Sequence, residues 1–461
     1  MASARSKIIP ELNNGLLILI GNSGGEKMAT IGKKLMALAV AAALGGLASS
    51  AVAGGFAIGT QSGSGTGNAF AGGAAGADDA SVAWYNPALM TLLPGKQAAA
   101  ALHVLKPSFK YRDSGSSTGL FASPPADSGN GGDGGNWAFV PDAFFTMAID
   151  PKWSFGLAVN VPFGLKTKYH TTWQGQLAAI KSEIKSVNVN PSVAYKVSDT
   201  VSVGGGLSVQ YLEAKLTNTT PVGALGDTKL KADDTGYGFN LGIMVQATPN
   251  LRIGAQYRSK IKYELEGTQS FDGAAASIAN ANIKADLDVP ESASLSLFHV
   301  LSPKWELMAD ITWTGWSSLQ KLTVTRTSAV TFPFPGGGGV GSTAASLDFK
   351  WDDTWRHSVG ANYKWSDQTK LRFGVAFDQT PTNDQTRTPR LPDQDRTWVA
   401  FGVQYKPSKT GILDIGYAHE FIKDAKVNAP VAGQSTCALG CLTGEFENQA
   451  DILSIQYSHS F

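Results

Sequence analysis

Segments in which apolar and polar side chains alternate constrain this chain more than any other feature. One face of residues 453–461 is largely apolar, and the other carries Ser and Gln. Residues 413–421 and 371–378 repeat this design. Because successive side chains of a β-strand point to opposite faces, these segments predict strands with one apolar and one polar side. The apolar side could line a soluble sandwich or cover the outside of a membrane barrel.

The connections between the segments separate these alternatives. Six are tight and carry turn residues, such as Asp150-Pro151, Ser198-Asp199 and Ser302-Pro303. The remaining connections, which alternate with the tight ones along the chain, are long and irregular, for example 166–185 and 317–345. Strict alternation of short and long connections is typical of outer-membrane barrels, which have short periplasmic turns and longer extracellular loops. We therefore predict an all-β fold, a fourteen-stranded antiparallel transmembrane β-barrel over residues 96–461.

The N-terminal region predicts export. Residues 28–53 combine Lys33 and Lys34 with an apolar stretch and the small-residue site Ala51-Val52-Ala53, which is the design of a signal peptide. The mature chain would begin at Gly54. We expect translation to start at Met28, which would make residues 1–27 a non-native upstream extension. A long n-region of the signal is the alternative.

Composition excludes several classes of protein. Only 16% of the 461 residues are charged, against about a quarter in soluble domains. No apolar run reaches the roughly 18 residues of a membrane-spanning helix. Without residues 1–53 the chain carries 33 basic and 35 acidic residues. It offers no basic field for nucleic acid, so no nucleic-acid partner is expected.

Residues 54–95 cannot form a domain by themselves. About forty residues rich in Gly, Ala and Ser bury too little side chain to offset the entropy lost on folding. The segment therefore needs a container, and the predicted barrel is the one available. We expect residues 54–95 to form a small N-terminal hatch inside the lumen.

We find no constellation that predicts catalysis. The six histidines are scattered, and none has ligand spacing or a neighbouring nucleophile. Asp78 and Asp79 are adjacent, so their side chains should point apart and serve turns or caps. The chain is predicted not to be an enzyme and to need no cofactor or metal. Cys437 and Cys441 favour a small loop disulfide over a metal site in an exported protein.

An ordered set of short motifs resembles the FadL/TodX family of outer-membrane transporters for hydrophobic compounds. The resemblance covers essentially the whole mature chain. It rests on Gly55-Phe56, Ala77-Asp78-Asp79-Ala80, Asn86-Pro87-Ala88, Gln256-Tyr257-Arg258-Ser259, Val289-Pro290-Glu291, Trp313-Thr314-Gly315-Trp316-Ser317 and, most specifically, Leu391-Pro392-Asp393-Gln394-Asp395-Arg396. It implies a monomeric, hatch-plugged barrel in the outer membrane of a Gram-negative bacterium. Its partners would be a hydrophobic small molecule and the surrounding lipid and lipopolysaccharide.

The resemblance also implies a route. A ligand would be caught between outer loops, pass to a pocket near the mature N-terminus and leave sideways at a kink in the third strand. Pro162 lacks an N–H and Gly164 lacks a side chain, so strand pairing should weaken there. An ordinary bulge is the alternative. By resemblance, the Asn86-Pro87-Ala88 turn would meet this kink, and Ala138 would lie at the opening.

Three residues are pocket candidates. Phe56 stands near the mature N-terminus, and a rough alignment places Asn218 where fatty-acid transporters would offer a basic side chain. Lys215 could replace that basic group, because alternation is expected to turn it inward together with Glu213. Leu212, Ala214 and Leu216 would then face outward. The ligand would be a long-chain fatty acid or a neutral or aromatic hydrocarbon.

The second long loop carries apolar residues at helical spacing: Trp173, Leu177, Ile180 and Ile184. They suit an amphipathic lid beside the outer groove, although they could equally anchor the loop to the barrel rim. Two other functions remain open at this stage. A general solute porin would need an open, charged lumen, and a surface adhesin or phage receptor would use the long loops.

Overall fold

The computed structural model describes residues 54–117, 129–334, 337–430, 437 and 440–461. The predicted upstream extension (1–27) and signal peptide (28–53) lie outside these residues. None of the described helices is long and apolar enough to cross a membrane.

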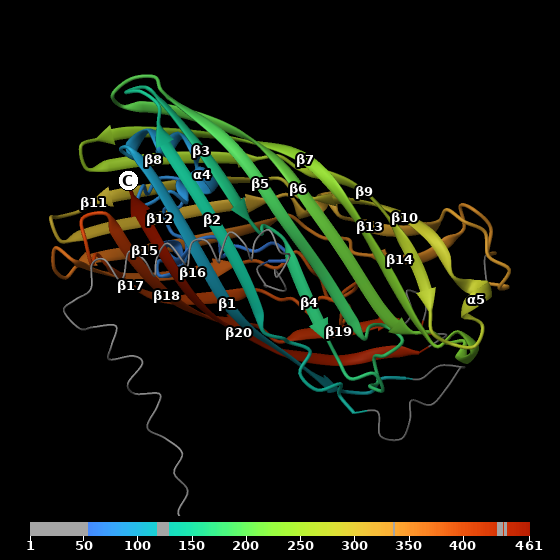
Figure 1. The fold of residues 1–461 in the computed structure, drawn as a ribbon. Coiled ribbons are helices and arrows are strands. Elements are labelled where there is room, and N and C mark those ends of the chain that lie inside the picture. Colours follow the sequence, from blue (N-terminus) through green and yellow to red (C-terminus); the bar gives the residue numbers. More distant parts are fainter. Residues whose placement is uncertain (1–53, 118–128, 335–336, 431–436, 438–439) are drawn as a thin grey trace, which may run out of the picture.

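The described chain forms one closed antiparallel sheet, in which β1 pairs with both β2 and β20 (Figure 1). Its twenty segments are β1 (Lys96–Asp113), β2 (Ala138–Ala148), β3 (Trp153–Asn160), β4 (Gly164–Lys168), β5 (Lys181–Lys196), β6 (Val201–Thr219), β7 (Asp227–Thr248), β8 (Leu251–Arg258), β9 (Ile261–Phe271), β10 (Ala281–Val289), β11 (Ser292–Val300), β12 (Trp305–Thr314), β13 (Lys321–Arg326), β14 (Thr343–Asp348), β15 (Thr354–Lys364), β16 (Thr369–Asp378), β17 (Arg396–Tyr405), β18 (Gly411–Ile422), β19 (Ala425–Pro430) and β20 (Cys441–Ser460).

These segments make fourteen strands, because six strands are interrupted once. The interrupted strands are β3/β4, β8/β9, β10/β11, β12/β13, β14/β15 and β18/β19. The fourteen-stranded barrel predicted from the sequence is therefore confirmed. Several of the motifs that resembled a known family fall at interruptions, among them Val289-Pro290-Glu291 between β10 and β11.

One predicted loop is shorter than expected. The sequence predicts a single long connection over residues 317–345, but β13 and residues 343–345 of β14 lie within it. The wall continues there because Leu322 and Val324 pack inward against β10, where Ala285 lies opposite Val324. The outer end of the barrel is accordingly built from paired strands rather than from loop.

The alternation of side chains follows the prediction. On β16, Phe373, Val375 and Phe377 are exposed on the outer face, whereas Arg372 and Ala376 are buried on the inner face. An exposed apolar surface around the whole wall suits a lipid environment.

Residues 54–94 contact strands on opposite sides of the barrel. The segment contains α3 (Gly63–Thr66), α4 (Val82–Tyr85) and η2 (Pro87–Leu92). Contacts run from α3 to β17, β18 and β20, and from η2 to β5, β6 and β7, so the segment lies within the barrel, as Figure 1 shows in blue. Inward glycines make room for it, since a Cβ on Gly374 would collide with the Asn68 backbone. The other short helices are η3 (Gly223–Leu225), α5 (Ala276–Ala279) and η4 (Trp316–Ser318).

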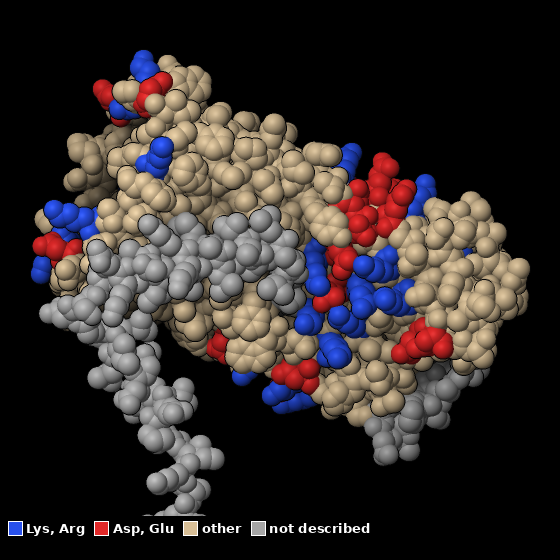
Figure 2. Space-filling model, in the orientation of Figure 1, with Lys and Arg blue, Asp and Glu red and all other residues tan. Residues whose placement is uncertain are grey.

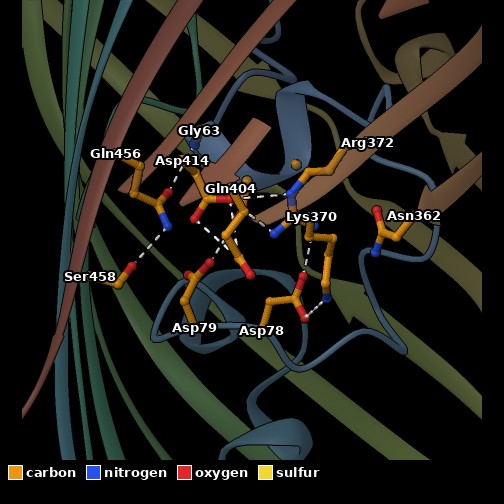
Figure 3. A network of polar contacts seen from close by, with 12 residues as sticks. Gly63, Asp78, Asp79, Asn362, Lys370, Arg372, Gln404, Asp414, Gln456 and Ser458 are labelled. Carbon is orange, nitrogen blue, oxygen red and sulfur yellow. Dashed lines mark hydrogen bonds and ion pairs between the residues drawn. The ribbon is translucent and has the colours of Figure 1, made fainter. Parts of the chain in front are cut away.

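An ion network ties this segment to the wall (Figure 3). The Asp78 carboxylate lies 2.8 Å from the Arg372 guanidinium and 3.6 Å from the Lys370 ammonium. Arg372 also pairs with Asp414 at 3.0 Å, and Lys370 with Glu306 at 3.0 Å. Asp79 instead accepts hydrogen bonds from the Ser64 hydroxyl and the Ser81 amide. The adjacent carboxylates thus have separate roles, one joining the segment to the barrel and the other shaping the segment itself.

Candidate functional site

The barrel wall is incomplete between its second and third strands. Residues 143–148 of β2 pair with β3, but the ladder ends at Ala143 and Val159. Beyond the interruption at 161–163, β4 pairs with β5 and not with β2 among the described residues. One strip of β2, residues 138–142, therefore has a strand neighbour only on the β1 side. Pro162 and Gly164 stand at this break, where the sequence placed the kink.

The start of the inner segment pairs with residues 162–164, which form the edge of the third strand at the break. The Ile58 amide donates to the Pro162 carbonyl (2.8 Å), and the Gly164 amide donates to the Phe56 carbonyl (2.9 Å). Ala57 and Phe163 form an antiparallel bridge between these two bonds. Exposed backbone groups are costly inside a membrane, so this pairing satisfies an edge that would otherwise be open.

The Asn86-Pro87-Ala88 turn does not meet the kink, and this prediction was wrong. The Asn86 side-chain amide donates to the Ile243 carbonyl of β7 (2.9 Å) and to Ala74 within the segment (2.7 Å). A Cβ on Gly204 of β6 would lie 2.7 Å from the Ala88 amide. The turn settles there because inward glycines of β6 and β7 leave space for its backbone, and Phe56 to Ile58 take its expected place.

The inner border of the gap is lined by small apolar side chains and one polar group. Ala138 is fully buried and packs in one cluster with Val140, Val161 and Ile58. The Asp142 carboxylate accepts a hydrogen bond from the Val161 amide (3.3 Å), which has lost its strand partner. The Nε2 atom of His103 lies within hydrogen-bond distance of the same carboxylate, 3.0 Å from Oδ2 of Asp142. Ala138 was predicted at this opening, but Asp142 was not, because its position in an inward-facing strand register was its only signal in the sequence.

An apolar pocket lies between Phe56 and the outer end of the barrel. Its wall includes Leu165, Ile184, Ala214, Leu265, Leu287 and Trp351. The Phe56 ring is held by aromatic neighbours, with centroid distances of 4.9 Å to Trp316 and 5.8 Å to Phe163. A second cavity of about 200 Å³ is lined by Ala57, Ile58 and Phe163 on the side of the wall break. Phe56 lines the apolar pocket and Phe163 lines the second cavity, so the contact between their rings lies between the two spaces.

The loop between β16 and β17 fixes the start of the inner segment beside this pocket. Asp393 accepts a hydrogen bond from the Gly55 amide (2.9 Å) and another from the Thr380 hydroxyl (2.7 Å). Arg396 forms an ion pair with Asp393 and a second with Glu420 at 3.0 Å. The Leu391 to Arg396 motif therefore serves as the anchor that positions Phe56.

Arg390 places a cation at the rim of the pocket. Its guanidinium donates to the Asn218 side-chain oxygen (3.0 Å) and to the Ser182 hydroxyl (3.2 Å). Among the described residues it forms no ion pair with a carboxylate. Burial lowers the pKa of Arg390 to about 10, which leaves it charged at neutral pH. Arg390 was not predicted from the sequence, although it directly precedes the Leu391 to Arg396 motif.

Asn218 lies at the pocket rim, but Lys215 does not. Leu212 is fully buried, and Ala214 and Leu216 line the pocket, so the even-numbered residues of β6 face inward. Lys215 and Glu213 consequently face outward, and the predicted orientation of Lys215 was wrong. The polar and apolar residues were assigned to the wrong sides because this end of the barrel has an apolar interior and a charged exterior.

The predicted lid helix is also absent from the described chain. Residues 171–180 form turns, and Ile184 belongs to β5 and faces the pocket. Trp173 is buried, stacks on Tyr169 at 4.4 Å and donates from its indole nitrogen to the Ala179 carbonyl. Ile180 is buried, and Leu177 packs beside Trp173. These residues anchor the loop to the rim, which was the alternative reading of their spacing.

Cys437 and Cys441 are joined by a disulfide at the start of β20. Cys441 pairs with Ser117 in an isolated bridge, so the disulfide closes the loop end near the start of the last strand. It lies apart from the pocket-lining residues described above.

Comparisons with known proteins agree with this architecture. The family model described as outer membrane protein transport protein (OMPP1/FadL/TodX) matches residues 45–461. A long-chain fatty acid transport protein of Salmonella typhi is 27% identical over 424 residues, which cover 85% of this chain and 92% of the relative. Outer membrane protein P1 of Haemophilus influenzae is 29% identical over 441 residues, covering 87% of this chain and 92% of the relative.

Solved structures show the same fold. A Pseudomonas aeruginosa FadL homologue has a TM-score of 0.79 and 26% identity, covering 89% of this chain and 100% of the homologue. The toluene transporter TodX of P. putida, with a TM-score of 0.62, 18% identity and coverage of 86% and 98%, is alike in fold. The chain belongs to the OMPP1/FadL/TodX family of outer-membrane transport proteins; it is a transporter of the Gram-negative outer membrane and not an enzyme.

Proposed function

We propose that this protein carries long-chain fatty acids across the outer membrane. The observation that carries the proposal is the half-buried Arg390 at the rim of an apolar pocket, where no acid among the described residues forms an ion pair with it. A fatty acid would supply what this site lacks, with a carboxylate for Arg390 and an alkyl chain for the pocket. The named relatives include long-chain fatty acid transport proteins, which supports this substrate over a neutral hydrocarbon.

The pocket would retain the ligand through its apolar walls. Each Å² of hydrocarbon kept out of water contributes about 25 cal/mol, so an alkyl chain gains little from a water-filled pore and much from an apolar route. Phe56, which lines the pocket and contacts Phe163 of the second cavity, would act as the ligand contact between capture and exit. Removal of a signal peptide over 28–53 would place the mature N-terminus at Gly54, two residues before Phe56.

We propose lateral release through the gap between β2 and β4. Strand pairing is missing there, and the edge is held by three residues of the inner segment rather than by a full ladder. Withdrawal of Phe56 to Ile58 would free that edge and connect the inner cavity with the lipid. The small side chain of Ala138 keeps the border of this route open.

Residues 54–95 would act as the hatch that prevents a continuous water-filled channel. The ion network at Asp78 supports this role, because it fixes the segment to β16. Burial opposes ionisation of Asp78, but Lys370 and Arg372 lower its pKa overall, so the carboxylate stays charged. A hatch that is tied by ion pairs at Asp78, but only by hydrogen bonds at Gly55 to Ile58, can shift locally at its N-terminal end while the barrel stays closed to ions.

Replacing Asp78 with Asn is expected to loosen the hatch and raise the ion leak. The change removes charge from the pairs with Lys370 and Arg372, at a cost of about 1–3 kcal/mol for charged hydrogen bonds. Planar-bilayer recordings should then show more frequent openings than the wild type. Asp367→Asn, which removes an exposed pair with Lys364 at a short turn, is the matched control. Equal leak from the two variants would contradict an anchoring role for Asp78.

Conductance also distinguishes this proposal from a general solute porin. A plugged barrel should give small, infrequent currents in planar bilayers. Large steady currents through the wild-type protein would exclude a hatch-closed transporter and favour the porin.

A further inference from the structure

A patch of lysines lies on the outside of the barrel, away from the pocket. On β4, β5, β6 and β7, the residues that alternate with the pocket-facing ones are charged near the long-loop end. Figure 2 shows Lys, Arg, Asp and Glu gathered in one band over the wall, between surfaces that are almost free of charge. This lysine patch consists of Lys166, Lys168, Lys181, Lys215, Lys229 and Lys231.

The strand register arranges the patch in two rows. Lys168 lies opposite Lys181, which lies opposite Thr217, and Thr217 lies opposite Lys229. In the second row the order is Lys166, Glu183, Lys215 and Lys231. With neighbouring strands about 4.8 Å apart, each row extends about 14 Å around the wall. Six lysines and one acid thus share a surface of small extent.

The patch retains unpaired positive charge. Glu183 is 9% exposed and pairs with Lys181 at 2.9 Å, and Lys231 pairs with Glu213 of the next row at 3.0 Å. Lys166, Lys168, Lys215 and Lys229 form no ion pair among the described residues. Clustered lysines repel one another, so a multivalent anion would stabilise this surface.

The position of the patch identifies the side of the membrane. Tyr211, Val209 and Leu207 are exposed on the outer face of β6 and lead toward the short turns, whereas Lys215 lies on the side of the long loops. Long loops of outer-membrane barrels are extracellular. One mixed row, with Glu213 and Asp233, separates the lysines from the apolar band. The patch therefore stands at headgroup height in the outer leaflet.

We propose that the lysine patch binds the phosphorylated sugar headgroup of lipopolysaccharide. Its phosphates would lie across the two lysine rows, while the acyl chains would cover the adjoining apolar wall of β5, β6 and β7. The lipid would thereby be held next to β4, which borders the gap in the wall. This inference depends on the outer-membrane location and is independent of what the pocket carries.

The test uses the full mature protein in lipid nanodiscs and purified lipid A as the probe. The triple variant Lys168→Gln, Lys215→Gln and Lys229→Gln is expected to bind lipid A at least tenfold more weakly, because each lysine near an anionic lipid surface contributes to attraction. Wild-type binding should weaken with added salt and be lost with dephosphorylated lipid A. Oleate binding and heat-modifiable migration should be unchanged in the variant, which would separate this result from misfolding and from the pocket.

Two controls make the inference falsifiable. Asp233→Asn removes an acid from the neighbouring row and should leave lipid A binding intact or stronger, while Lys406→Gln removes a lysine beside a short turn and should have no effect. Unchanged binding by the triple variant would overturn the proposal. Equal binding of lipid A and phosphatidylglycerol, or of dephosphorylated lipid A, would overturn it as well, because the phosphorylated headgroup would not be recognised.

Discussion

Replacing Arg390 with Met is expected to weaken oleate binding by about tenfold or more. The change keeps much of the side-chain length but removes the half-buried charge that we pair with the ligand carboxylate. A hydrogen bond to a charged group contributes about 1.5–3 kcal/mol, which corresponds to at least a tenfold change in affinity. The measurement is displacement of a fluorescent fatty acid from the purified protein at pH 7.

Binding of methyl oleate and two further variants show whether the lost affinity comes from the lost charge. Methyl oleate has the same chain without the negative charge, so its binding should change little in Arg390→Met. Arg390→Lys should retain part of the affinity because it keeps a cation. Lys423→Gln removes an exposed cation between β18 and β19, beside this loop, and should have no effect. If oleate and methyl oleate lost affinity equally, Arg390 would hold the loop and not the carboxylate.

Replacing Ala138 with Arg is expected to reduce fatty-acid uptake to the background of cells that lack the protein. Ala138 is fully buried at the border of the gap, so a long charged side chain there would fill the proposed exit. A bulky charged residue at Gly164, on the other side of the gap, should act in the same way. Uptake of radiolabelled oleate by intact cells is the measurement, and heat-modifiable migration checks that the barrel has folded.

Ala400→Arg provides the matched control for Ala138→Arg. Ala400 is buried in the same apolar cluster, but its strand is paired on both sides, with Gly374 and Ala418 as neighbours. It carries the same cost of burying a charge without blocking the gap. Binding of oleate to the purified Ala138→Arg protein should be normal, because the capture pocket is untouched. Wild-type uptake by a folded Ala138→Arg protein would exclude release at this gap.

The architecture was predictable because its signals are local and repeat. Alternation in segments such as 371–378 fixed which side chains face lipid, and short and long connections fixed the strand count. The interruption at Pro162 and Gly164 was also predictable, since one residue lacks a backbone donor and the other lacks a side chain.

The site was less predictable because it depends on contacts between distant segments. The sequence does not reveal that Gly204 and Gly242 leave space for Asn86-Pro87-Ala88, while Phe56 to Ile58 pair at the kink. The predicted orientation of Lys215 was wrong because apolar side chains face outward only where the wall meets lipid. Beyond the membrane the apolar side chains line the pocket, and the lysines lie outside. Arg390 was not predicted because it lies in a loop, where no periodic pattern indicates which way a side chain points.

Uptake of radiolabelled oleate and toluene by deletion cells, with and without the restored protein, tests the central claim most directly. If the protein transports long-chain fatty acids, restoring it should restore oleate uptake well above the deletion background and leave toluene uptake little changed. Toluene uptake that depends on the protein while oleate uptake does not, or independence of both compounds, would contradict the account.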